Sequence, residues 1–309
     1  MTGMNTPVAW VAGALDSRLA PKAREFQTRA RQELRSGADD TRFSGLISLA
    51  SRYVGAVPLA PSAAELTAAA TAVPGWNPQR WTLRECSRVD LVLTRSQQDS
   101  EGGIHAIESA FAFADMGELC ALYRSLALLP RPERFAARAA EGARTNIRAV
   151  FEAAICDTPF PVRYFDDVAW RQCVVKALFI EAPLWRVVGL DERLDAELAR
   201  MALDLAEERH SAGRHVNPQL WLCLGPHGGE RGFAALLREL EGDGPVDCRA
   251  AAALGLGRLD AKTRARAELA TRAARESDGT IRSALLLAQS GAVTQQAFQS
   301  FDGPVPKVV

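Results

Sequence analysis

Apolar residues recur at helical spacing, three or four positions apart, along almost the whole chain. Ala, Leu, Arg and Glu dominate the sequence, and all four are good helix formers. No convincing strand run interrupts this pattern. Helix starts and stops are marked by capping residues before prolines and by glycines after periodic segments, at Thr6-Pro7, Asn77-Pro78, Gly37, Gly55 and Gly213. The pattern predicts an all-α protein, a multi-helix α/α bundle or superhelix of many moderately long helices.

A weak internal repeat lies near the C-terminal end. "CRAAAALGLGR" (248–258) aligns with "IRSALLLAQSG" (281–291) at an offset of 33, which pairs Arg249 with Arg282, Ala251 with Ala284 and Leu254 with Leu287. A period of this size in helical sequence indicates stacked helix pairs of the HEAT type. We therefore predict a helical body over residues 1–224 and a HEAT-like helical tail over 225–309, or one continuous domain.

The segment "PERFAARAAEGARTN" (132–146) opens a predicted helix that runs to about residue 154. On a helical wheel its residues separate into a core side, with Ala136, Ala140, Ala143, Ile147, Val150 and Ala154, and an outer stripe, with Arg134, Arg138, Glu141, Thr145, Arg148 and Glu152. The ordinary interpretation is a solvated face with ion pairs such as Arg148 with Glu152. The alternative is that the stripe forms part of a site.

Two polar residues fall on the flanks of this predicted helix, Arg144 beside Phe151 and Asn146 beside Phe135. A polar side chain among apolar neighbours needs a hydrogen-bond partner, because an unmet buried polar group costs roughly 1–3 kcal/mol. Arg144 and Asn146 therefore either tie the helix to a loop or contact a ligand.

The next predicted helix, "YFDDVAWRQCVVKALFIEAPL" (164–184), is apolar nearly all round, which predicts a central buried helix. Its most apolar side holds Phe165, Val168, Val175 and Phe179, with Gln172 among them and Lys176 one turn on. Gln172 then requires a partner, and Lys176 either snorkels to water or lines a cavity, as Schiff-base lysines do. Asp166 or Asp167 is expected to cap this helix.

Together the two helices supply the candidate ligand-binding residues. They are Arg134, Arg138, Glu141, Arg144, Asn146, Tyr164, Gln172 and Lys176. No catalytic residue can be named from the sequence.

The composition indicates which classes of partner and which cellular compartment to expect. The 37 Lys and Arg balance 37 Asp and Glu without a basic block, so nucleic acid is not an expected partner. The six Cys lie far apart without zinc-ligand spacing, which favours free thiols in a reducing cytoplasm. The N-terminal segment has no Lys or Arg before its short apolar run and no stretch long enough to span a bilayer, so we predict a cytoplasmic protein without a transmembrane segment.

No motif assigns a reaction or a cofactor. The four His show no H-E-x-x-H or other ligand spacing, and "GLGR" after Leu254 lacks the rest of a G-x-G-x-x-G. Walker lysine and G-x-S-x-G patterns are also missing. We therefore predict no metal, nucleotide or other cofactor.

Three long segments carry a family resemblance, and they follow one another along the chain. They are "ALYRSLALLPRPERFAARAAEGARTNIRAVFEA" (121–153), "PFPVRYFDDVAWRQCVVKALF" (159–179) and "RVVGLDERLDAELARMALDLAEER" (186–209). In this order they resemble the EboA-domain family of bacterial metabolite-traffic proteins. With a looser likeness in "FSGLISLASRYVG", the resemblance covers most of residues 43–224. Family-typical residues present here include Pro132, Glu133, Arg134, Arg138, Glu141, Asn146, Tyr164, Asp166, Trp170, Lys176, Asp191 and Arg193.

The resemblance implies a helical cytoplasmic protein that moves or matures precursors of secondary metabolites. Members of the family are encoded beside a UbiA-like membrane prenyltransferase, TIM-barrel and TatD-like proteins and a dinucleotide-binding protein. No reaction comes with the resemblance. A small-molecule metabolite or a pathway protein, such as the membrane prenyltransferase, is therefore the expected partner.

Three functions follow as hypotheses. The first is a non-catalytic carrier or adaptor that binds a hydrophobic precursor or a pathway partner in a groove between the two central helices. The second is an enzyme, a transferase or isomerase of specialised metabolism, which requires the charged candidates to converge around a closed pocket. The third is a scaffold that binds proteins through a HEAT-like tail.

Overall fold

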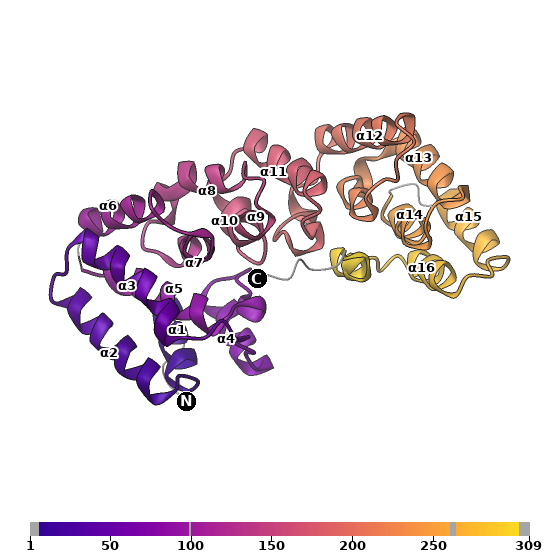
Figure 1. Cartoon of the computed structure of the whole chain (residues 1–309). Helices are drawn as coiled ribbons and strands as arrows, with labels where there is room; N and C mark the ends of the chain where they lie inside the picture. Colours follow the sequence, from indigo (N-terminus) through magenta and orange to yellow (C-terminus); the bar gives the residue numbers. More distant parts are fainter. Residues whose placement is uncertain (1–5, 99, 260–263, 303–309) are drawn as a thin grey trace. The chain divides into compact units, whose positions relative to one another are not determined.

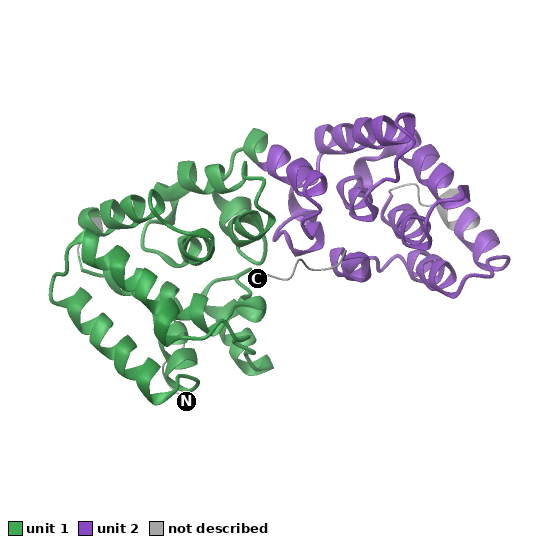
Figure 2. Ribbon diagram, in the orientation of Figure 1, with its two compact units in different colours: residues 1–169 green, residues 170–309 purple. Residues whose placement is uncertain are grey.

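The computed structural model describes residues 6–98, 100–259 and 264–302, and helices make up most of these ranges (Figure 1). These ranges hold no strand, only isolated bridges such as that between Pro58 and Thr82. The all-α prediction is confirmed. The chain divides into two compact units, residues 1–169 and 170–309 (Figure 2). The division falls inside helix α11 (Asp167–Phe179).

The first unit packs its helices around α5 (Leu83–Ser96), in which every residue from Cys86 to Thr94 is buried. This helix contacts α1 (Pro7–Asp16), α2 (Pro21–Arg35), α3 (Asp40–Tyr53), α6 (Ser100–Phe111) and α7 (Met116–Ser125). The other elements of the unit, with 3-10 helices labelled η, are α4 (Ala63–Ala72), η1 (Pro78–Arg80), η2 (Leu126–Leu128), η3 (Pro132–Phe135), α8 (Ala136–Gly142), α9 (Arg148–Ile155) and α10 (Phe160–Tyr164).

Polar side chains at the centre of the first unit bond to one another. The Asp90 carboxylate on α5 accepts hydrogen bonds from Arg31 Nε and Gln27 Nε2 on α2, both at 2.6 Å. Ser87 Oγ donates to Gln27 Oε1, also at 2.6 Å. A helix that carries an aspartate can therefore lie in the core, because its partners replace the lost water.

Capping residues set the ends of several helices as predicted. Thr6 Oγ1 accepts from Ala9 N at 3.2 Å at the start of α1, and Gly37 follows α2 with a φ of 89°. Asp166, rather than Asp167, caps α11, since its Oδ1 accepts from Ala169 N at 2.7 Å. Asn77 begins only the three-residue η1.

The second unit is centred on α14 (Val246–Arg258), where the residues from Ala250 to Leu256 are all buried. Besides the larger part of α11, the unit contains η4 (Leu184–Arg186), η5 (Asp191–Arg193), α12 (Ala196–Ser211), η6 (Pro218–Cys223), η7 (Gly225–His227), α13 (Gly229–Glu241), α15 (Arg264–Ala273), α16 (Gly279–Ser290) and η8 (Gln295–Phe301).

Two glycines let neighbouring helices approach α14 closely. A Cβ atom built on Gly255 would lie 2.6 Å from Leu236 Cδ2 of α13, and one on Gly257 would lie 2.7 Å from Ala288 Cα of α16. Helices α14 and α16 hold the two copies of the 33-residue repeat. Their packing alone does not establish a HEAT repeat, so the HEAT-like tail and the boundary at residue 225 stay predictions.

Candidate functional site

The segment after Pro132 is not one helix. The chain forms η3, then α8, and turns between Gly142 and Arg148 before α9 begins. Gly142 packs so tightly that a Cβ there would lie 2.7 Å from Tyr123 Cε1, and Thr145 Oγ1 accepts from Ile147 N at 3.1 Å. Such side-chain bonds to the local backbone compete with helix, and alanine periodicity does not reveal them. The prediction of a continuous helix to residue 154 is therefore wrong.

The break changes which predicted core residues are buried. Val150 and Ala154, in α9, are buried as expected, whereas Ile147 lies before α9 and is 48% exposed. The predicted ion pair between Arg148 and Glu152, within α9, is confirmed at 2.8 Å.

The outer stripe of η3 and α8 faces α6 and pairs with it. Arg134 lies 3.3 Å from Glu101, and Arg138 lies 2.7 Å from Glu108 and also pairs with Glu141. The Arg138 guanidinium sits 5.0 Å from the centroid of the Phe111 ring. The stripe is thus an interhelical ion-pair network at the surface of the first unit.

Exposure and ionisation agree with this description of the network. The side chains of Arg134 and Glu141 are 47% and 54% exposed. Hydrogen bonds from Arg131 and Arg134 hold the pKa of the Glu101 carboxyl below its usual value. Partly exposed ion pairs of this kind join neighbouring helices at a protein surface, so the network suits helix packing better than proton transfer.

Arg144 and Asn146 lie in the turn between α8 and α9, and both are exposed. Their predicted positions on the flanks of a helix, beside Phe151 and Phe135, are wrong because the helix ends at Gly142. Tyr164 is the last residue of α10, with its ring 4.8 Å from that of Phe160. Of the predicted residues in the first unit, Arg138 and Glu141 pair directly, and Arg134 pairs with another residue of α6.

The prediction of a central buried helix over 164–184 is also wrong. The buried side of α11 holds Trp170, Cys173, Val174, Ala177 and Leu178. Of the side predicted to be most apolar, Phe165 is buried and Val175 is partly exposed. Val168 and Phe179 are 61% and 60% exposed, and Gln172 between them is also exposed. Burial therefore does not oblige Gln172 to pair.

Gln172 and Lys176 belong to the second unit, whereas the other six candidate residues belong to the first. Lys176 is partly exposed, one turn after Gln172 on α11. The groove between the two predicted helices stays a prediction.

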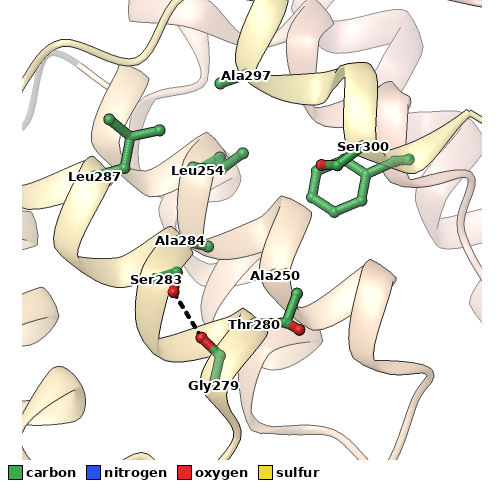
Figure 3. A pocket seen from close by; sticks show the side chains of 10 residues that line it. Ala250, Leu254, Gly279, Thr280, Ser283, Ala284, Leu287, Ala297 and Ser300 are labelled. Carbon is green, nitrogen blue, oxygen red and sulfur yellow. Dashed lines mark hydrogen bonds between the residues drawn. The ribbon is translucent and has the colours of Figure 1, made fainter.

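A groove that the site prediction missed lies in the second unit between α14, α16 and η8 (Figure 3). Its cavity measures about 400 Å³ and is lined by Ala250, Leu254, Gly279, Thr280, Ser283, Ala284, Leu287, Ala297, Ser300 and Phe301. None of the predicted binding residues lines it. The repeat carried a signal for it, because the aligned residues Leu254 and Leu287 both line the groove, as does Ala284.

A scan against protein-family models matches residues 8–225 of the 309 to the family described as metabolite traffic protein EboA. The chain belongs to the EboA family. No curated protein and no solved structure matches it. The ion-pair network of α6, η3 and α8 falls inside the EboA match, whereas the groove of α14, α16 and η8 lies beyond its end.

The family description names a function in metabolite traffic. Two further observations on the described residues concern metal-binding groups and membrane-spanning helices. Within the ranges that the structure describes, no group of three or more His, Cys, Asp or Glu is placed to hold a metal ion. No helix of the same ranges is long and apolar enough to cross a membrane. One of the four histidines, His210, pairs with a carboxylate: its Nε2 lies 2.8 Å from Glu239 Oε2.

The six cysteines of this EboA protein are all buried, and none of the six forms a disulfide. Burial raises the pKa of the Cys173 thiol to about 12 and that of Cys120 to about 11. A thiol with such a pKa is protonated at neutral pH and is a poor nucleophile. These cysteines therefore act as small core residues.

Proposed function

We propose that this protein is a carrier or adaptor in the traffic of a specialised metabolite, and that it works by binding rather than by catalysis. In this proposal it works in the cytoplasm, and it takes either a hydrophobic precursor or a protein of its pathway, such as a membrane prenyltransferase. The EboA match supports the role in metabolite traffic.

The observation that supports a binding role is that the charged candidate residues are engaged in ion pairs at the surface. Arg134, Arg138 and Glu141 pair with one another or with α6 at the surface, instead of converging on an enclosed cavity. An enzyme that used them would need to break these pairs before substrate could be bound or a proton transferred. The enzyme hypothesis therefore has less support than a binding role.

The test starts from protein purified from its own host under mild conditions. Organic extraction and mass spectrometry should identify an apolar metabolite that co-purifies, or a pull-down should recover a pathway protein. A strain that lacks the gene should accumulate the precursor. Capture of neither a metabolite nor a pathway protein, together with an unchanged metabolite profile in the deletion strain, would refute the proposal.

A variant separates binding from catalysis. Replacing Arg134, Arg138 and Glu141 together by Gln should leave the co-purifying metabolite and the precursor levels of the host unchanged. Under the enzyme hypothesis, the same triple variant behaves like the deletion strain.

A further inference from the structure

The groove of the second unit has the dimensions of a small-molecule site. Its volume of about 400 Å³ falls within the range of roughly 300–1,000 Å³ typical of ligand pockets. It opens to the surface between three elements, with α14 as its floor and α16 and η8 as its walls (Figure 3).

Both walls are held from behind. Helix α16 lies against α14 at Gly257 and Ala288, where the backbones approach too closely for any side chain on Gly257. The η8 wall is fixed by Gln295, whose Nε2 donates to Trp185 O and Val187 O, both at 2.7 Å. The groove is therefore a built feature of the unit, and a ligand would find it already formed.

The lining is uncharged and amphipathic. Leu254 and Leu287 provide an aliphatic end, and Thr280 and Ser283 bring hydroxyls from the first turns of α16 (Figure 3). Ser283 Oγ donates to Gly279 O at 2.7 Å, and its oxygen can still accept a hydrogen bond from a ligand. Among the described residues that line the groove, none carries a charge.

We propose that this groove binds a neutral amphiphile, a small hydrocarbon with a hydroxyl or carbonyl at one end. The hydrocarbon contacts Leu254, Leu287 and Phe301, and the polar end bonds to the hydroxyls of Thr280 or Ser283. A carboxylate or phosphate is disfavoured, because the lining offers no cation to pair with it. The inference deepens the proposed function, on which it rests only for the biological source of the ligand.

The experiment uses geraniol, a neutral branched alcohol, and geranic acid, which has the same carbon skeleton and a carboxylate at neutral pH. Titration calorimetry on the full chain should show binding of geraniol. Geranic acid should bind more weakly at pH 7, since the lining offers no cation to pair with its carboxylate. Equal affinity for the two, or no binding of geraniol, would overturn the proposal.

Adjacent leucines on α16 provide a matched pair of variants. Leu287 lines the groove and is 39% exposed, whereas Leu286 is 53% exposed and is not part of the lining. Leu287→Gln should weaken geraniol binding about tenfold, and Leu286→Gln should change it by less than about twofold. Ala297→Phe, which fills the groove from η8, should also weaken binding, and circular dichroism checks that each variant is folded.

Two outcomes would show that geraniol binds elsewhere and would overturn the proposal. One is an equal effect of the two leucine variants, and the other is unchanged binding in both Leu287→Gln and Ala297→Phe. The result is separable from that of the proposed function. If host metabolites are captured equally well by Leu287→Gln, the proposed function stands and the groove fails. If geraniol binds in the groove but no host metabolite or pathway protein is captured and the deletion strain keeps its metabolite profile, the groove stands and the proposed function fails.

Discussion

At the scale of single residues, Glu65 makes the clearest use of its charge. It completes a capping box with Ser62 at the start of α4, and its two carboxylate oxygens accept from Arg18 Nη1 and Nη2 at 2.8 and 2.7 Å. These hydrogen bonds, those from Arg18 above all, lower the pKa of Glu65 to about 2. One side chain therefore caps the start of α4 and links α4 to Arg18, which lies just after α1.

The lowered pKa of Glu65 predicts a specific loss of stability in acid. The folded-state pKa is below the unfolded value, so the stabilisation is fully present above about pH 4.5 and is lost as the pH falls toward 2. Glu65→Gln should cost about 1–2 kcal/mol at pH 7 and much less near pH 2. Urea unfolding across this pH range measures the effect, with Glu25→Gln, at an exposed position of α2, as a control expected to lie near zero. A constant difference between wild type and Glu65→Gln at every pH would contradict the assignment.

The candidate residues were only partly predictable at this scale. The sequence indicated that Arg134, Arg138 and Glu141 share a face, because they lie within three turns of one another. It could not place Arg144 and Asn146, since the tight contact of Gly142 with Tyr123 involves residues about 19 positions apart (142 − 123). Local periodicity has no information about such a contact.

At the scale of elements, helix contacts decide which surfaces are buried. Helix α8 is joined to α6 by Arg138, which pairs with Glu108 and lies over Phe111. Helix α16 meets α14 at Gly257, where small residues allow close approach. Each contact makes a separate prediction.

The Arg138 contact should be worth little, because both charges are partly exposed. A double-mutant cycle with Arg138→Gln and Glu108→Gln should give a coupling of about 0.5–1 kcal/mol, and added salt should reduce it. Chemical denaturation of the four proteins measures it. A coupling of several kcal/mol would show that the network is far better shielded from water than its exposure indicates.

The Gly257 contact should be costly to disturb. Gly257→Ala would place a methyl group 2.7 Å from the Ala288 backbone, and we expect it to destabilise the protein by about 1–3 kcal/mol. Gly45 in α3 is the matched control, since a Cβ there meets nothing within 4 Å. Gly45→Ala should therefore stabilise by about 0.5–1 kcal/mol through helix propensity. Thermal unfolding distinguishes the two, and a neutral Gly257→Ala would contradict the close approach.

At the scale of the whole molecule, the family match and the compact units end at different places. The match ends at residue 225, whereas the units divide after Ala169. Elements on both sides of residue 225 pack together: Cys248 Sγ of α14 lies 3.4 Å from Val216 O, and Gly255 of α14 approaches Trp221 of η6. The predicted tail thus shares a core with residues before it in the second unit.

This sharing predicts the outcome of truncation after residue 224. The shortened chain should lose the structure of its second unit, because Trp221 is fully buried and would lose α14 as a partner. The first unit should keep its own cooperative transition. Hydrogen exchange measures this as lost protection in α12 and η6 with retained protection in α5. Unchanged protection in α12 and η6 would instead support an independent domain before residue 225.

The sequence by itself determined the helical class, many helix ends and the family, because helix propensity, capping residues and the order of long helical segments are all properties of the chain read along its length. Only the tertiary structure decided that α5 is central, that Val168 and Phe179 of α11 are exposed, and that Leu254 and Leu287 line a groove. The physical reason is that burial depends on partners distant in sequence. Asp90 can be buried because Arg31 and Gln27 meet it, and an apolar face stays exposed where no other helix covers it.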